Sequence, residues 1–452
     1  MFKKRIALVV LVFFIVFTAG SAAFVFGSSK EKAAEAPEEV SEPEAVEEKG
    51  PSGELILFHW WTAAGEKEAM HKSFELFEQR YPDVDIVENP VAGGGGANIR
   101  SVLASKLAAG MPPDGFNILE GAKIKVYIDS DFLEPIDDIW YASGMEDKYL
   151  LDKKMLNING HYWAMPFHAN RANYIWYDKQ LFEELGLTMP KDADDLLDVC
   201  KTIAAKKPDI APISLGSKYK WTTIYTFDTI LLSMLGSEFY KDFYTGKVDI
   251  ESNADLRSVV EKFKKLVPYI YEYHSTKTWD EAADLVFNHK AAMYIMGDWA
   301  YGRFLSMGWK YDVELGGWPF PDEIWFGHPD CYTLCKGAPS PDLIGLFLEN
   351  ESVPETQLQL SLLKGSTACV KGVDPSDYPD RLRQHNMAQL LDPTVPKMGN
   401  AFAGLSTPAF VNDFMEILQE FLYDVDVDLM LKRTADSMAK NNVKEEMAWY
   451  WE

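Results

Sequence analysis

The order of apolar and polar positions predicts short buried strands that alternate with amphipathic helices. Residues 55–58 are a continuous apolar run, which favours a strand buried on both faces of a parallel sheet. A helical face runs from Glu66 to Tyr81 and ends at Pro82, and residues 84–87 form the next strand. This order predicts an α/β fold that begins with a βαβ unit and a parallel sheet.

The same pattern continues along the rest of the chain. The segments with helical periodicity are residues 181–185, 193–205, 255–267, 279–289, 343–363, 408–422 and 430–451. The segments predicted to be extended are residues 115–121, 161–177, 291–296 and 323–334. Residues 214–227 break the helical pattern around Trp221. The aromatic- and amide-rich residues 161–177 lie between two helical regions, which favours a crossing from one domain to another.

Polar and aromatic side chains follow the predicted strands. They are Trp60 and Trp61 after residues 55–58, Asn117 and Glu120 within residues 115–121, and Asp298 and Trp299 after residues 291–296. Ligands of open parallel sheets bind beyond the carboxyl ends of the strands. A rigid indole offers an apolar face to the C–H side of a sugar ring, although packing in the core is the competing interpretation of both tryptophans.

A glycine-rich turn at residues 93–96 precedes the next helix. No Gly-Lys-Ser/Thr sequence follows it and the dinucleotide-binding spacing of glycines is absent, so phosphate binding is disfavoured. We interpret the turn as a place of flexibility or of close backbone approach.

The first 27 residues have the layout of a secretory signal, with basic residues 3–5, an apolar run and then small residues. The apolar character continues through residue 26, which leaves an uncleaved membrane anchor open. Residues 28–53 are rich in Glu and lack an apolar core, so we expect a disordered acidic linker. Export follows from this reading, to the periplasm or another extracytoplasmic location, while a membrane tether stays open.

Composition and motif searches exclude several classes of partner and of enzyme. The 452 residues carry a formal net charge of −25, which disfavours nucleic acids and anionic membrane surfaces as partners. The four cysteines are too few for a disulfide scaffold, and a bridge between Cys200 and Cys369 is left open. The metalloprotease and serine hydrolase motifs are absent, so we expect no metal and no cofactor. A glycosidase needs only two carboxylates, which keeps an exported carbohydrate-active enzyme as the second class.

Five segments together resemble the sugar-binding proteins of ATP-driven bacterial uptake systems. They are ELILFHWW, YPDVDIVENPVAGGGGANIRSVL, AMPFHANRANYIWYDKQLF, KAAMYIMGDWAYG and LKGS, in this order. The likeness covers residues 54–422. It is nearest to the glucose- or mannose-binding branch of bacterial extracellular solute-binding protein family 1, which also includes the maltose-binding protein.

The resemblance implies a type II periplasmic binding protein fold, with two α/β lobes joined by a hinge and a sugar cleft between them. It places residues 54–166 with 323–369 in the N-terminal lobe and residues 167–322 with 370–452 in the C-terminal lobe. The implied protein is a monomeric, non-enzymatic receptor that hands a mono- or short oligosaccharide to an ABC transporter permease. A sugar sensor subunit for a signalling kinase shares this fold and stays an alternative.

By motif position the resemblance also implies the residues that contact sugar. They are Trp60, Trp61, Glu66, Asn117, His168, Asn170, Trp221, Asp298 and Lys364. Asp298 would accept from two neighbouring hydroxyls, Lys364 would donate to one, and the indoles would stack on the ring. Two histidines of the glucose-binding branch are replaced, by Leu119 and near Ala403, so a small saccharide is implied more firmly than glucose itself.

Overall fold

The computed structural model describes residues 50–63, 65–96, 98–424 and 426–451. The predicted signal or anchor at residues 1–27, and the acidic linker as far as residue 49, lie outside these described residues. Within the described ranges, no helix combines the length and the apolar character needed to cross a membrane.

The first of two main sheets holds seven strands, in the order β13-β12-β3-β1-β2, with β4 and β7 also paired to β12. Their bounds are β1 (Gly53–His59), β2 (Val84–Pro90), β3 (Gly115–Ile118), β4 (Leu133–Glu134), β7 (Ala164–Arg171), β12 (Trp325–Cys335) and β13 (Lys397–Gly399). β1 lies parallel to β2 and β3, which confirms the predicted βαβ start. β12 runs antiparallel to β3 and β7, so the expectation of a purely parallel sheet is wrong.

The second sheet has the order β11-β8-β10-β9 and is also mixed, because β8 runs antiparallel to both of its neighbours. Its strands are β8 (Tyr174–Asp178), β9 (Ala211–Ser214), β10 (Ala291–Ile295) and β11 (Leu315–Pro319). A separate pair consists of β5 (Asn157–Ile158) and β6 (His161–Tyr162).

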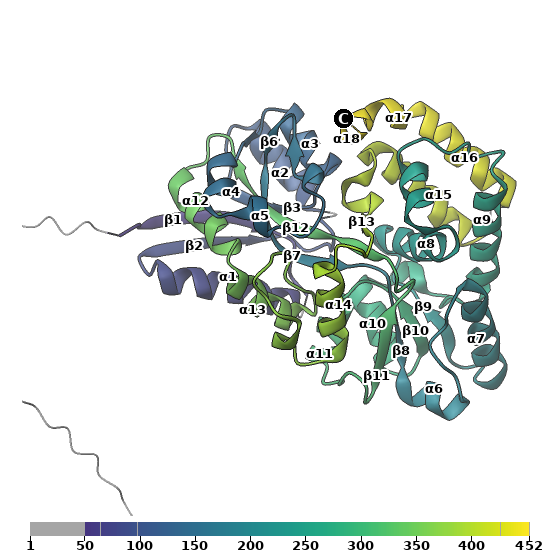
Figure 1. Cartoon of the computed structure of the whole chain (residues 1–452). Coiled ribbons are helices and arrows are strands. Elements are labelled where there is room, and N and C mark those ends of the chain that lie inside the picture. Colours follow the sequence, from purple (N-terminus) through teal and green to yellow (C-terminus); the bar gives the residue numbers. More distant parts are fainter. Residues whose placement is uncertain (1–49, 64, 97, 425, 452) are drawn as a thin grey trace, which may run out of the picture. The chain divides into compact units, whose positions relative to one another are not determined.

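Helices pack on both sheets (Figure 1). Those of the first half of the chain are α1 (Glu66–Arg80), α2 (Ile99–Ala108), α3 (Ala122–Asp129), α4 (Asp137–Ala142), α5 (Met145–Lys148), α6 (Lys179–Leu185), α7 (Ala193–Lys206) and α8 (Trp221–Tyr244). Those of the second half are α9 (Ala254–Leu266), α10 (Trp279–Phe287), α11 (Trp299–Ser306), α12 (Pro341–Glu351), α13 (Pro354–Lys364), α14 (Arg381–Leu391), α15 (Pro408–Phe421), α16 (Val427–Lys440), α17 (Val443–Glu446) and α18 (Ala448–Trp451). α1, α12 and α13 pack against the first sheet and against one another, whereas α7 and α10 pack against the second.

Short turns of 3₁₀ or π-helix complete the described part. They are η1 (Lys153–Met155), η2 (Val267–Tyr269), η3 (His274–Thr276), η4 (Pro375–Asp377) and the π-helical η5 (Ala401–Leu405).

α15 illustrates how local sequence sets an element. The Thr407 hydroxyl accepts from the Phe410 backbone N–H at 3.4 Å, and Pro408 occupies the first helical position, where its missing N–H costs nothing. Phe414 and Phe421 recur on its buried face. These features confirm the helix predicted over residues 408–422.

α8 is the longest element that the sequence pattern missed. It begins at Trp221, where the sequence pattern predicted a break, and residues 221–232 are all buried. A helix that is buried on every side shows no polar face, and so it lacks the periodicity by which amphipathic helices are recognised. Gly236, with a φ of 76°, interrupts it.

The C-terminal region also differs from its prediction. The single helix expected over residues 430–451 is three helices, α16, α17 and α18. Asn442 adopts the left-handed conformation with a φ of 44° and breaks the run between α16 and α17.

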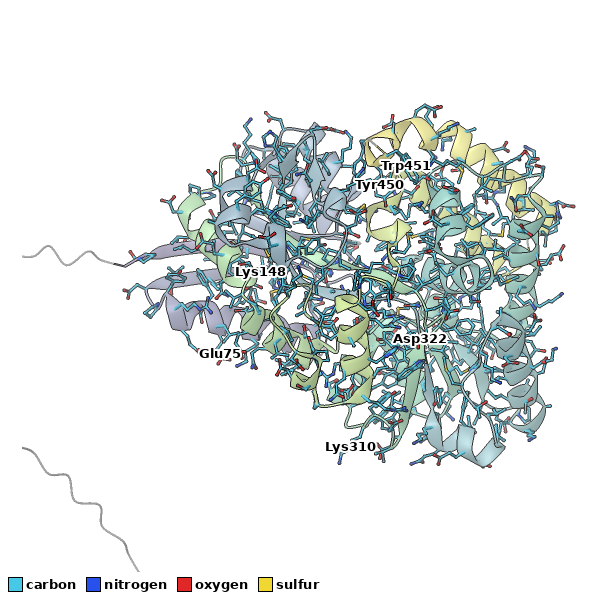
Figure 2. All side chains as sticks on the ribbon, viewed as in Figure 1. Glu75, Lys148, Lys310, Asp322, Tyr450 and Trp451 are labelled. Atoms are coloured by element: carbon cyan, nitrogen blue, oxygen red, sulfur yellow. The ribbon has the colours of Figure 1, made fainter. Side chains whose placement is uncertain are left out.

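The chain passes between the two sheets after β7, through residues 172–173, and again through residues 320–324 before β12. The buried Arg171 guanidinium joins these connections, because it donates to the carbonyls of Asp322 (3.0 Å) and Ile324 (2.9 Å) and to Asn173 Oδ1 (3.0 Å). Figure 2 labels Asp322 in the second connection. Residues 161–177 therefore do pass from one sheet to the other.

The lobe boundaries inferred from the resemblance stay a prediction. β7 pairs within the first sheet as far as Arg171, and β13, which falls in the predicted C-terminal lobe, pairs with β12 of the first sheet. All four cysteines are buried and free, so the Cys200–Cys369 bridge that the sequence left open does not form.

Candidate functional site

A small cavity is lined by residues from two strands of the first sheet, from helices and from the turns between them. The lining residues are Trp60, Glu66, Gly95, Leu119, Asn170, Trp221, Tyr225, Trp279, Trp299, His328, Asp330, Lys364 and Phe402. The empty space among them is about 350 Å³, and the centre of a water molecule can occupy about 30 Å³ of space there. That is room for about two waters and less than a sugar ring needs.

Two antiparallel strands supply the polar floor of the cavity. In the β7–β12 pairing, Asn170 lies opposite His328 and His168 lies opposite Asp330. Because alternate residues of a strand point to the same face, the register brings these four side chains together on one side of the sheet. The imidazole of His328 also lies 2.6 Å from Asn400 Nδ2.

Asp330 is the most heavily bonded side chain of the floor. Its Oδ2 accepts from His168 Nε2 at 2.9 Å, from Trp61 Nε1 at 3.2 Å and from Asn170 Nδ2 at 3.3 Å. Burial alone would raise the pKa of Asp330, but the hydrogen bond from His168 and the Lys364 charge outweigh it and hold that pKa below its usual range. Asp330 is therefore a buried anion whose Oδ2 accepts three hydrogen bonds.

Burial lowers the pKa of both neighbouring histidines, to about 4 for His168 and about 3 for His328, and the Lys364 charge acts in the same direction. Both imidazoles are neutral at pH 7. Each neutral ring has one donor and one acceptor nitrogen, so the floor offers polar groups without added positive charge.

Lys364 stands between two carboxyl groups at the cavity wall. Its ammonium donates to Asn170 Oδ1 at 2.8 Å and lies 3.5 Å from Glu66 Oε1 and 3.9 Å from Asp330 Oδ2. Burial raises the pKa of Glu66 to about 7, although Lys364 opposes the rise. Lys364 is the last residue of α13, and the helix ends there because Gly365 takes the left-handed conformation.

Aromatic rings form the rest of the wall. The Trp221 ring centre lies 5.9 Å from that of Phe402 and 6.0 Å from that of Trp299. The indole nitrogens of Trp221 and Trp299 are buried, and neither has a hydrogen-bond partner among the described residues. Buried donors in folded proteins are nearly always paired, so these two N–H groups mark a place where a ligand can bind.

The glycine-rich turn approaches this wall closely. A Cβ on Gly94 would lie 2.8 Å from Trp279 Nε1, and one on Gly95 would lie 3.0 Å from the Phe402 ring. Gly95 also has a φ of +65°. This confirms the interpretation of residues 93–96 as a turn of close approach.

The structure brings six of the predicted site residues to the cavity: Trp60, Glu66, Asn170, Trp221, Trp299 and Lys364. The other five lie elsewhere. Trp61 and His168 bond to Asp330 from behind the lining, Asn117 lines a second, larger cavity, and Glu120 lines a third with Asp152.

Asp298 lies next to Trp299 but does not line the cavity. Its Oδ2 accepts from the Arg171 backbone N–H at 2.8 Å, and its Oδ1 has no partner among the described residues. Burial raises the pKa of Asp298 to about 8, against the opposing effect of the Arg171 hydrogen bond, so the carboxyl is largely protonated at pH 7. One of its two oxygens, Oδ1, is therefore left without a partner in the described part of the chain, rather than the two that the resemblance offered to sugar hydroxyls.

Sequence reasoning missed five side chains that line the cavity: Tyr225, Trp279, His328, Asp330 and Phe402. His328 and Asp330 were detectable, because they alternate on a strand that was predicted to be extended, which puts two polar groups on one face. Tyr225 lies in the helix that was missed. In the part of the chain that the structure covers, no group of three or more His, Cys, Asp or Glu side chains could hold a metal ion.

Comparison with known proteins identifies the relatives of this chain. Residues 63–350 match the family model described as bacterial extracellular solute-binding protein. An uncharacterized ABC transporter extracellular-binding protein of Pyrococcus horikoshii is 35% identical over 399 residues, which cover 87% of this chain and 90% of the relative. A probable sugar-binding periplasmic protein of Brucella melitensis is 27% identical over 337 residues, covering 72% and 75%.

Solved structures are similar in fold. The bacterial solute receptor AcbH, described as having an exclusive substrate preference for β-D-galactopyranose, superposes with a TM-score of 0.75 at 16% identity. The likeness covers 87% of this chain and all of the other.

Proposed function

We propose a binding function for this chain, which belongs to the bacterial extracellular solute-binding proteins. The family and the type II periplasmic binding protein fold predicted from the sequence are both confirmed. In our proposal the chain holds a mono- or short oligosaccharide in the cavity lined by Trp60, Trp221 and Lys364 and delivers it to an ABC transporter permease outside the cytoplasm.

The observation that carries the proposal is the pair of buried, unpaired indole N–H groups of Trp221 and Trp299. A hydroxyl that reached them would satisfy donors that the protein leaves without a partner. Lys364 and Asn170 add a charged donor and an amide beside the same space. Flat aromatic faces with a few polar groups at fixed positions suit a sugar ring, which has C–H faces and hydroxyl edges.

Entry requires the walls to move apart, since the cavity has room for about two waters. The connections at residues 172–173 and 320–324 are the places where such a hinge motion would be absorbed. Closure around sugar would then be a shift of population toward a state whose cavity is wide enough for the ring.

A glycan-cleaving enzyme is the second candidate, because two carboxyl groups, Glu66 and Asp330, line the cavity and have pKa values shifted in opposite directions. We favour binding alone. Asp330 Oδ2 already accepts three hydrogen bonds, and Lys364 lies between the two acids. Incubation with a bound oligosaccharide should therefore release no new reducing ends.

A thermal-shift screen against neutral mono- and disaccharides tests the proposal, since a ligand that binds only the folded state raises the melting temperature. We expect at least one sugar to raise it for the wild type. Lys364→Met should abolish the rise, and Lys310→Met, at an exposed position labelled in Figure 2, should keep it. No rise with any sugar would reject the proposal.

A further inference from the structure

A second cavity adjoins the first and is the larger of the two. Trp60, Gly95 and Leu119 line both. In the second cavity the centre of a water molecule can occupy about 330 Å³, which is within the range of ligand pockets. A molecule held in the first cavity could therefore extend into the second past Trp60.

The walls of the second cavity are mostly apolar, with Ile99, Leu103 and Phe116 among them. Against these walls stand two cationic side chains, Arg100 of α2 and Lys123 of α3. None of the described residues that line the cavity is acidic. In a chain with a net charge of −25, two cationic side chains thus line the same cavity, and no carboxylate is among its described lining residues.

Lys123 is 94% buried, with a relative exposure of 6%. Neither its ammonium nor the Arg100 guanidinium has a hydrogen bond or an ion pair to a described residue. The ammonium lies over the ring of Phe402, whose centre is 5.1 Å away. Burying a charge without a partner is unfavourable, and a second cation nearby adds to the cost.

We propose that this second cavity binds an anionic group, a carboxylate or a phosphate, carried by the sugar unit next to the one in the first cavity. The inference rests on the proposed function and names its substrate class as acidic saccharides. Lys123 and Arg100 would pair with the anion, and the apolar walls would cover the ring that carries it.

The state of Lys123 supports this reading. Burial lowers the pKa of Lys123 to about 7, and the Arg100 charge acts in the same direction. The other titratable groups that line the cavity are Arg100 and Tyr127. A bound anion favours the ammonium form, so binding near pH 7 should take up a proton at Lys123.

Calorimetry with two matched pairs of probes tests the proposal: trehalose with trehalose 6-phosphate, and cellobiose with cellobiouronic acid. We expect the acidic member of at least one pair to bind the wild type about tenfold or more tighter than its neutral partner, a gain of about 1.4 kcal/mol. The pair whose acidic member binds more tightly than its neutral member shows whether the anion is a phosphate or a carboxylate. Titration in two buffers of different ionisation enthalpy should show proton uptake.

Lys123→Met should reduce the preference to less than about threefold and abolish proton uptake. The matched control is Lys125→Met, which removes a half-buried lysine, paired with Asp129 outside the cavity lining, from the same helix. It should leave both readouts unchanged. If Lys123→Met does not fold, Arg100→Gln should reduce the preference at least threefold.

Equal affinity within both pairs, no binding by either acidic probe, or a preference that survives Lys123→Met would overturn the inference. A neutral sugar that still raises the melting temperature would in that case leave the proposed function intact. Failure of every neutral and acidic sugar would reject both.

Discussion

Glu66→Gln tests the electrostatic description of the cavity. Glu66 is 7% exposed, and burial raises the pKa of its carboxyl from 4.5 to about 7, against the opposing charge of Lys364. The folded state therefore holds this proton more tightly than the unfolded state does. Between pH 4.5 and 7 the folded state binds more protons, so the stability contributed by this group is present at low pH and is lost as the pH rises.

The expected magnitude follows from the two pKa values. The difference between 4.5 and about 7 corresponds to about 3 kcal/mol, of which about 2 to 3 kcal/mol falls between pH 5 and pH 8. Glutamine has nearly the same shape and does not titrate. Lys364 would keep Asn170 Oδ1 at 2.8 Å as a partner, so the substitution leaves no unpaired cation. The variant should gain stability relative to the wild type as the pH rises.

Urea unfolding of both proteins at pH 5, 6, 7 and 8 measures this difference. The control is Glu78→Gln, which makes the same change at an exposed position of the same helix and should show no trend. A difference between Glu66→Gln and the wild type that stays constant within about 0.5 kcal/mol from pH 5 to pH 8 would refute the reasoning.

Three further predictions follow from local geometry. Trp299→Phe keeps an aromatic ring but removes the unpaired indole N–H. Calorimetry should show that the sugar with the highest affinity binds about tenfold more weakly, a loss of about 1.4 kcal/mol. Unchanged affinity would show that Trp299 does not contact the sugar. Gly302→Ala would place a Cβ 2.3 Å from the Lys364 carbonyl oxygen and should lower the unfolding free energy by about 1 to 3 kcal/mol in urea, and an unaltered midpoint would contradict the close packing of α11 on α13. Because the four cysteines are free, dithiothreitol should leave the melting temperature unchanged, and a decrease would reveal a disulfide.

Much of the fold was predictable because its elements are amphipathic or continuously apolar. α1, α15 and the strands β1 and β10 lie where apolar spacing placed them, within two residues at each end. α8 was missed for the converse reason, because its first twelve residues are buried all round and show no period. The mixed strand directions of the first sheet depend on where β12 returns, and strand spacing does not encode that return.

Local sequence predicted the candidate site where a side chain follows a buried strand, as with Trp60 after β1 and Trp299 after β10. Lys364 was reached only through the family resemblance. The site was not predictable where the decisive fact is a strand register. Asp330 accepts a hydrogen bond from His168 only because the pairing of β12 with β7 places the two residues opposite each other. The boundary between the two adjoining cavities likewise depends on how Gly95 packs on Phe402, which is a tertiary contact.

The most direct test of the central claim is a crystal structure of the protein with the neutral sugar that raises its melting temperature most. The account predicts electron density for a sugar ring among Trp60, Trp221 and Trp299, with hydroxyls within hydrogen-bond distance of the Trp299 indole nitrogen and the Lys364 ammonium. Density for that sugar at any other place, with the two indole nitrogens still unpaired, would contradict it.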